Sequence, residues 1–454
     1  MDSETVQLKF DFAQKDPEGI SHTRVNPKLS NGNLNKLSPQ DRAFHDWYRF
    51  VLSFPPHLVR RYIEYFNLSQ QAVVLDPFCG TGTTLLEAKK AGIQSVGLEA
   101  NPFPFFASSV KLDWNLSPEL LLTHAREIAS TTLDILQSQG IDDNQILNFD
   151  KHNASLWTLP DEANSLLLKN SISPLPLHKT LVLLENLNKY KGYPFYRHAL
   201  LALANALVYK ISNLHFGPEV GVKNPKMDVP VVENWLAEID KMARDLRSVN
   251  GRKFADAYLY KTDARSLDSI PSDSVDAVIT SPPYPNEKDY TRTTRLESVL
   301  LGFVNNKQEL RQLKKGLVRS NTRGVYKEDD DDLWVSDNQE IQRIAVEIEN
   351  RRIALGKDSG FERQYGKVTK LYFGGMARHF AELRRILRPG AKLAYVVGDQ
   401  ASYLRVMIRT GQLLADIAAK LGYEVVDIDL FRTRLATSTK EQLREEVVIL
   451  RWKG

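Results

Sequence analysis

The chain has 454 residues, of which 42% are hydrophobic and 26% are charged, and its formal net charge is +4 at pH 7. This composition is that of a soluble globular protein with two or three domains, and no apolar run approaches the roughly 20 residues of a transmembrane helix. The single cysteine, Cys79, excludes intrachain disulfides and a cysteine-rich zinc site. We therefore expect a cytoplasmic protein without a metal site or a membrane partner.

Residues 1–40 are polar, rich in Asn, Ser, Pro and Lys, and without periodicity, which predicts a flexible N-terminal arm. Acidic residues precede any apolar run there, so we expect no secretory signal. Helices are predicted over 42–50 and, after a Phe-Pro-Pro segment, over 57–66, where apolar residues recur at helical spacing.

Strands and helices then alternate along the chain. A strand over 72–75, a helix over 84–91 and a strand over 95–98 have the sequence form of a βαβ unit, which predicts a parallel sheet covered by helices. Residues 41–117 are therefore interpreted as the first part of an α/β domain.

Two insertions interrupt this α/β domain. From 118 to 255 the sequence is typical of helices, and we interpret this segment as a helical insertion that serves as scaffold or partner surface. The α/β pattern resumes over 256–284, is interrupted again over 285–370, and ends over 371–454. A polar connection joins the last two strands, which predicts an antiparallel pair at the sheet edge.

A turn with two glycines follows the first predicted strand. Gly80 and Gly82 can adopt positive φ and have no Cβ to block a ligand, and the next helix aims unpaired N–H groups at the same place. Glu99 ends the following strand, where a carboxylate can accept both hydroxyls of a ribose. Asp76 would lie near a cofactor ammonium group, and Asp263 would accept from an adenine amino group. The alternatives are a plain tight turn with surface acids and, for Asp263, a helix N-cap.

A second turn carries the reaction chemistry. Pro282 and Pro283 fix φ and remove two N–H donors, which leaves outward carbonyl acceptors. Ser281 Oγ and the Pro282 carbonyl can then accept both hydrogens of an exocyclic amine, and Tyr284 offers a ring on which a flat base can stack. The two turns together predict a methyl donor and a planar amine acceptor in one site. The alternative is a strand end that is merely stiffened by proline.

The insertion over 285–370 holds a local excess of positive charge, which suits a polyanion. Seven of its basic residues are candidates for binding nucleic acid: Arg292, Arg295, Arg311, Lys314, Lys315, Arg319 and Arg323. A helix is predicted around 340–353, and the acidic run over 328–332 is interpreted as a solvated loop. The alternative for the whole insertion is a charged, solvated lid.

The glycine turn over 76–83 resembles the cofactor motif of amino-DNA methyltransferases that use S-adenosylmethionine. The segment over 280–284 resembles their catalytic motif, in the Ser-Pro-Pro-Tyr form associated with methylation of cytosine N4. Residues 50–56 are similar to the segment that packs on the methionine part of the cofactor. The resemblance covers about half of the chain, over 47–114, 258–290 and 372–452. It departs from many cytosine N4 enzymes, which are circularly permuted, because here the glycine turn comes first.

This resemblance implies a class I methyltransferase fold, which is a Rossmann-like doubly wound sheet with an antiparallel edge strand. It implies S-adenosylmethionine as cofactor, double-stranded DNA as substrate, a restriction or defence protein as a possible partner, and 285–370 as a target-recognition insertion. The alternative for the helical insertion over 118–255 is that it reads the DNA sequence. The catalytic residues would be Ser281, Pro282, Pro283 and Tyr284. The cofactor-binding residues would be Phe54, Asp76, Pro77, Phe78, Gly80, Gly82, Thr83, Thr84, Glu99, Asn101, Asp263 and Ala264.

The expected reaction is direct methyl transfer to the N4 amine of a cytosine flipped out of the duplex. Transfer to carbon 5 would need a cysteine nucleophile at the catalytic strand, and Cys79 lies in the cofactor turn instead. Adenine N6 enzymes usually have Asp or Asn in place of Ser281, but methylation of adenine N6 in DNA stays open. An RNA base N-methyltransferase and an inactive scaffold subunit with a cofactor fold also stay open.

Overall fold

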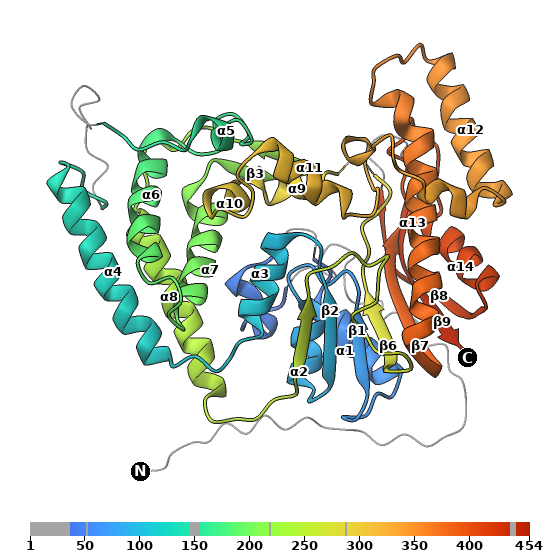
Figure 1. Cartoon of the computed structure of the whole chain (residues 1–454), viewed down its shortest axis with the longest axis horizontal. Coiled ribbons are helices and arrows are strands. Elements are labelled where there is room, and N and C mark those ends of the chain that lie inside the picture. Colours follow the sequence, from blue (N-terminus) through green and yellow to red (C-terminus); the bar gives the residue numbers. More distant parts are fainter. Residues whose placement is uncertain (1–36, 51–52, 145–154, 218, 287, 436–441) are drawn as a thin grey trace.

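The computed structural model describes residues 37–50, 53–144, 155–217, 219–286, 288–435 and 442–454. Most of the predicted N-terminal arm lies outside these residues. A twisted sheet flanked by helices occupies the centre, the helical insertion lies to one side of it, and a long helical hairpin rises at the other end (Figure 1). No helix among the described residues is both long and apolar enough to span a bilayer.

The central sheet has seven strands in the order β5-β2-β1-β6-β7-β9-β8. The strands are β1 (Val73–Asp76), β2 (Gln94–Leu98), β5 (Ala257–Tyr260), β6 (Val275–Thr280), β7 (Leu387–Gly398), β8 (Tyr423–Leu435) and β9 (Gln442–Trp452). The first five in this order pair in parallel, whereas β9 is antiparallel to both β7 and β8. The strand order reverses between β1 and β6, which makes this a doubly wound sheet of the class I methyltransferase type. The predicted antiparallel pair at the edge is confirmed.

Helices cover both faces of the sheet. They are α1 (Pro56–Tyr65), α2 (Thr83–Lys90), α3 (Pro102–Lys111), α13 (Tyr365–Ile386) and α14 (Thr410–Lys420). Along β6, Val278 packs in the core formed with α13 and α14, whereas Ala277 and Ile279 pack in the core formed with α1. Side chains on a strand alternate between the two faces, so a strand buried on both faces is apolar throughout.

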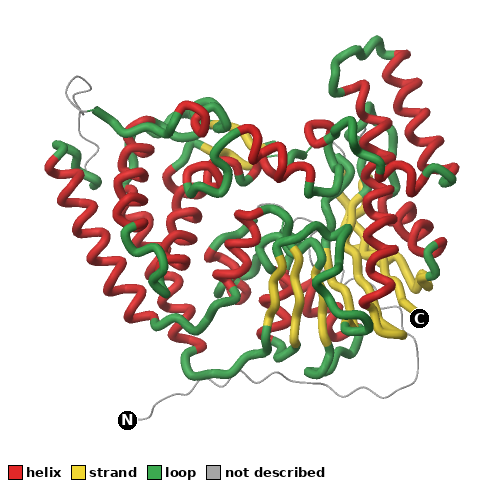
Figure 2. The backbone as a smooth tube through the Cα atoms, viewed as in Figure 1, coloured by secondary structure: helices red, strands yellow, loops and turns green. Residues whose placement is uncertain are grey.

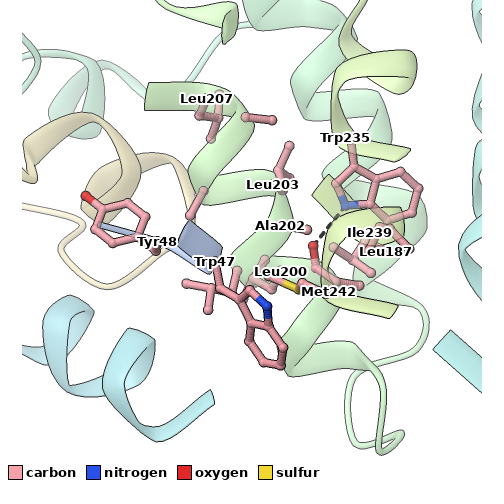
Figure 3. Packing of buried hydrophobic residues seen from close by; sticks show 14 of the residues in the cluster. Trp47, Tyr48, Leu187, Leu200, Ala202, Leu203, Leu207, Trp235, Ile239 and Met242 are labelled. Atoms are coloured by element: carbon pink, nitrogen blue, oxygen red, sulfur yellow. Dashed lines mark hydrogen bonds between the residues drawn. The ribbon is translucent and has the colours of Figure 1, made fainter. Parts of the chain in front are cut away.

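The helical insertion packs in a hydrophobic core that it shares with α2 and α3. It contains α4 (Pro118–Ser138), α5 (Asp161–Asn164), α6 (Pro174–Asn188), α7 (Tyr196–Ala206), the π-helical turn η3 (Leu207–Ile211) and α8 (Val231–Val249). Trp235 packs among leucines and Met242, and its Nε1 donates to the Ala199 carbonyl at 2.9 Å (Figure 3). Trp47 donates to Asp245 at 2.8 Å and so ties the segment before α1 to this core. A small ribbon of β3 (Leu214–Phe216) and β4 (Val220–Val222), which the sequence did not predict, completes it.

The second insertion is built from short helices and one long one. They are α9 (Tyr290–Thr293), α10 (Arg295–Leu300), α11 (Lys307–Lys315), η4 (Thr322–Gly324), η5 (Asp331–Val335), α12 (Gln339–Ala354) and η6 (Glu362–Gln364). The helix predicted around 340–353 is confirmed as α12, which pairs with α13 to form the hairpin seen in Figure 2. The domain boundaries themselves stay a prediction.

Two sequence predictions were wrong. The segment over 42–50 is no α-helix but contains the 3-10 turn η2 (His45–Trp47), after η1 (Pro39–Asp41), because Phe44 adopts a φ of 66° that breaks helical geometry. The acidic run over 328–332 is not uniformly solvated, since Asp331 is buried and forms an ion pair with Arg265. Neither the positive φ nor the distant basic partner is visible in the local sequence.

Candidate active site

The carboxyl ends of the parallel strands open into a cavity of about 730 Å³. Both predicted turns contribute to its wall, although they lie about two hundred residues apart in the chain. The predicted catalytic and cofactor-binding residues that line it are Phe54, Pro77, Phe78, Gly80, Thr83, Glu99, Asn101, Asp263, Ala264, Ser281, Pro282, Pro283 and Tyr284. Two predicted nucleic-acid-binding residues, Lys314 and Arg319, line it as well. Asp76, Gly82 and Thr84 lie behind this wall.

The two glycines of the first turn are needed for different structural reasons. Both have positive φ, 51° at Gly80 and 82° at Gly82. A Cβ at Gly82 would lie 2.4 Å from Ser108 Oγ on α3, so that glycine allows α2 and α3 to pack closely. A Cβ at Gly80 would meet nothing within 4 Å and would project into open space beside the cavity. Gly80 is therefore the position at which a ligand can approach the backbone.

Glu99 is buried beside this turn. Its two carboxylate oxygens accept from the backbone N–H of Gly80 at 2.9 Å and of Asn101 at 2.7 Å. Burial outweighs these bonds and raises the pKa of Glu99 to about 7. The carboxylate is thus fixed in orientation at the end of β2, with lone pairs left to accept further hydrogen bonds.

Asp76 lies under the turn and connects it to β6. Its Oδ1 accepts from Thr280 Oγ1 at 2.6 Å and from the Phe78 N–H at 3.1 Å. Its Oδ2 is buried and has no hydrogen-bond partner among the described residues, and burial raises the pKa of Asp76 to about 6. Because Asp76 does not line the cavity, its contact with a cofactor ammonium group stays a prediction.

The loop after β5 is held by side chains that the sequence analysis missed. Asp263 accepts from the Arg265 N–H at 2.9 Å and pairs with the Arg265 guanidinium at 2.6 Å. It therefore stabilises its own turn, and its contact with adenine stays a prediction. The Ala264 carbonyl accepts from His379 Nδ1 at 2.7 Å, and His379 Nε2 lies 2.7 Å from Tyr395 Oη. Burial lowers the pKa of His379 to about 4, so this histidine is neutral and Nε2 accepts from the tyrosine.

The catalytic turn presents acceptors to the cavity. Ser281 Oγ donates to the Val396 carbonyl at 3.1 Å, which occupies the hydroxyl proton and leaves the oxygen lone pairs as acceptors. The Tyr284 N–H donates to Tyr290 Oη at 3.1 Å. Burial is the main cause that raises the pKa of the Tyr284 phenol, followed by the charge of Glu445. Tyr284 is therefore a neutral ring at the cavity wall.

The predicted nucleic-acid-binding residues fall into two groups that differ in burial. Arg319 is buried and forms an ion pair with Asp329 at 2.8 Å, and Lys314 forms an ion pair with Asp289 at 2.7 Å. These two side chains support the fold of the insertion itself. Arg295 is also partly buried, with bonds to Thr291 and the Leu166 carbonyl, and Arg292 is half-buried.

Arg311 and Arg323 are exposed. Their guanidinium groups lie 5.3 Å from the Tyr326 ring centre and 5.6 Å from the Phe361 ring centre, respectively. Lys315 is partly exposed, with Glu328 at 4.0 Å. These three are the predicted residues whose charge remains accessible to a polyanion.

Several cavity-lining residues carried no sequence signal. They come from the loop after the catalytic turn, from the loop after β7 and from the β8–β9 hairpin: Asn286, Gln400, Ser402, Phe431, Arg432, Arg434 and Glu445. The alternation of polar and apolar residues along β8 and β9 predicts strands, but it does not say which polar side chains reach a cavity.

Comparisons with known proteins indicate what kind of enzyme has a site of this geometry. A family model described as DNA methylase, of the N6/N4 type, matches residues 13–105, which include the glycine turn. The chain is also 27% identical to the Type II methyltransferase M.BsoBI of Geobacillus stearothermophilus over 94% of its own length and 87% of that protein. These matches support a DNA methyltransferase of the N4/N6 type. S-adenosylmethionine is accordingly the methyl donor of this DNA methyltransferase.

A second relative of the methyltransferase covers a similar span. The Type II methyltransferase M.AvaI of Nostoc sp. is 24% identical over 92% of this chain and 86% of that protein. Among solved structures, a SAM-dependent methyltransferase from Methanosarcina mazei is 10% identical, with a TM-score of 0.29 over 86% of this chain and 96% of that one. That likeness is weak, so the fold assignment depends on the strand order of the methyltransferase itself.

Proposed function

We propose that this DNA methyltransferase transfers a methyl group from S-adenosylmethionine to the N4 amine of cytosine at a specific sequence in duplex DNA. The observation that carries the proposal is the shared cavity, in which a ligand-accessible glycine and a hydrogen-bond-accepting serine face the same space. The relatives are named Type II methyltransferases. We extend the proposal to a restriction–modification pair, in which this enzyme protects DNA from a cognate endonuclease.

The cofactor would be held by acidic side chains and by the glycine turn. Glu99 would accept from the ribose hydroxyls, and the negative charge of Asp76, buried behind the glycine turn, would attract the ammonium group. Asp263 and the backbone near Ala264 would contact the adenine, and Phe54 would pack on the methionine part. When bound, S-adenosylmethionine supplies an electrophilic methyl group on its sulfonium.

The residues of the catalytic turn would raise the nucleophilicity of the target amine, whose lone pair is delocalised into the ring. Ser281 Oγ and the Pro282 carbonyl would each accept a hydrogen bond from one N–H of the amine, which favours a pyramidal nitrogen. Tyr284 would stack on the base. The amine nitrogen would take the methyl group as its bond to sulfur breaks, with S-adenosylhomocysteine as the leaving group, and the extra amine proton would pass to water. No covalent enzyme intermediate is needed.

The target base must leave the duplex for its amine to reach this turn, at a cost of a few kcal/mol. Contacts between exposed basic side chains and phosphates would offset that cost and set affinity. Arg311, Lys315 and Arg323 are the candidates, because their charges remain accessible.

The test is to sequence DNA from cells that express the enzyme, with detection of modified bases. We expect N4-methylcytosine at one short motif, and its loss in the Ser281→Ala variant, which should still bind S-adenosylmethionine. N6-methyladenine without N4-methylcytosine would contradict the proposed base. Methyl transfer to structured RNA but not to duplex DNA, measured with a tritiated donor, would contradict the proposed polymer.

A further inference from the structure

An ion pair on the β8–β9 hairpin faces the same cavity. Arg432 and Glu445 are directly opposite each other in the register of the two strands. The guanidinium is bound through two contacts, with Nε 2.6 Å from Oε2 and Nη2 2.9 Å from Oε1 of the carboxylate. The side chains are 17% and 11% exposed, and both line the cavity. Such a fork fixes the plane of the guanidinium.

The register of β7 and β9 places the Arg432–Glu445 pair against the catalytic turn. Gly398, the last residue of β7, is opposite Glu445 in register. A Cβ at Gly398 would lie 3.0 Å from Cε2 of Tyr284 and 3.4 Å from Cγ of Glu445. The missing side chain therefore lets the tyrosine ring and the glutamate stem lie over one backbone position, so the pair lies beside the ring on which the base would stack.

The pair leaves hydrogen-bond donors for a ligand. An arginine side chain has five N–H donors, and Glu445 is the one acceptor that Arg432 has among the described residues. Because the carboxylate offsets the positive charge, the guanidinium can lie at a largely buried wall without an uncompensated charge. What remains is a planar set of N–H groups that is held in place and has no further acceptor in the part of the chain that the structure describes.

The ring edges of the two possible bases differ at this position. Next to its amino group, cytosine has two acceptors in a row, N3 and the O2 carbonyl, whereas adenine has N1 followed by a C–H. A planar guanidinium matches two adjacent acceptors, and it leaves donors unpaired against a C–H. We propose that Arg432, positioned by Glu445, donates to the N3–O2 edge of the flipped base and thereby selects cytosine over adenine. This inference rests on the proposed function and names the residue that sets its base specificity.

The test measures methylation for each combination of target base and enzyme variant, as in a double-mutant cycle. Duplexes carry the site found by sequencing, with the target base as cytosine, as 3-deazacytosine, which lacks the N3 acceptor, or as 2-thiocytosine, which has a weaker acceptor in place of O2. Relative kcat/KM is measured for the wild type and for Arg432→Met. Differences in the intrinsic reactivity of the bases occur with both enzymes and cancel in the ratio.

For the wild type, we expect kcat/KM to fall on the analogues by about 10- to 100-fold more than it does for Arg432→Met, because a hydrogen bond to a charged donor is lost. The variant should bind S-adenosylmethionine as the wild type does, which shows that it is folded. Glu445→Gln, which keeps the side-chain volume but removes one carboxylate acceptor, should show an intermediate sensitivity to the analogues.

Arg434→Met is the matched control. Arg434 lies two residues along the same strand and also lines the cavity, but it is 41% exposed and lies 3.5 Å from Glu445. Its loss should leave the analogue sensitivity of the wild type intact. Equal sensitivity of Arg432→Met and the wild type, with N4-methylcytosine still formed, would overturn this inference alone. A wild type that methylates no cytosine would instead overturn the proposed function.

Discussion

Replacing Gly82, at the point where α2 packs closely against α3 behind the glycine turn, should lower the stability of the protein. At Gly82, φ is +82° and ψ is 33°, a left-handed conformation, in which a residue with a Cβ costs about 1–2 kcal/mol. The added Cβ of Gly82→Ala would also lie 2.4 Å from Oγ and 3.3 Å from Cβ of Ser108. Overpacking of this kind costs about 1–3 kcal/mol. We expect the two terms together to lower the free energy of unfolding by roughly 2–5 kcal/mol.

A second substitution separates the two terms. Ser108→Ala removes the Oγ and leaves the 3.3 Å contact as the closest one, so the double variant should recover about 1–3 kcal/mol and retain the backbone cost. Gly80→Ala is the matched control, because its φ is also positive but its Cβ would meet nothing within 4 Å. That variant should lose about 1–2 kcal/mol from the backbone alone.

Calorimetric thermal unfolding measures these differences, at roughly 2 °C for each kcal/mol in a protein of this size. We expect Gly82→Ala to unfold about 4–10 °C below the wild type, and the double variant to unfold above Gly82→Ala. If Ser108→Ala gave no recovery, or if Gly80→Ala were as damaging as Gly82→Ala, the packing argument for this turn would be refuted.

Three further predictions concern binding and stability. Burial raises the pKa of Glu99 to about 7, and its ionised form would bind the cofactor. Affinity for S-adenosylmethionine, measured by titration calorimetry, should therefore fall as the pH drops from about 8 to about 6. The Glu99→Gln variant should bind weakly, with little pH dependence above about 6.5. Tyr284→Ala should lose about 1–3 kcal/mol of base stacking in kcat/KM for DNA, whereas Tyr284→Phe should keep most of the activity, and equal losses would contradict stacking. Arg319→Met should lower stability by about 3–5 kcal/mol, because it removes the ion-pair partner of the Asp329 carboxylate, whose side chain is only 9% exposed. Arg311→Met should instead leave stability unchanged and reduce the salt dependence of DNA binding by about one unit of slope.

The parts of the site that local sequence determines were predictable. Gly80, Glu99 and Ser281 each follow an apolar strand of a parallel sheet, and the carboxyl ends of such strands meet at one edge. The strand order therefore brings the two turns to one cavity, and the positions of the two motifs after predicted strands were enough to predict this.

The rest depends on contacts between distant segments. Arg432 and Glu445 reach the cavity because Gly398 leaves room beside Tyr284, and nothing in the local pattern of β8 or β9 indicates this. Arg319 carries the same charge as the exposed Arg311, but its burial against Asp329 gives it a structural role. A list of charges in a sequence does not distinguish these two situations, because the distinction is made by burial.

The measurement that tests the central claim most directly is a crystal structure of the enzyme with duplex DNA and a stable analogue of the methyl donor. We predict that the target cytosine is flipped onto the Tyr284 ring and that its amine is bound by Ser281 Oγ and the Pro282 carbonyl. The reactive carbon position should lie within about 3–3.5 Å of the amine nitrogen. A donor analogue bound away from the glycine turn, or a target base that remains stacked in the duplex with its amine far from Ser281, would contradict this account.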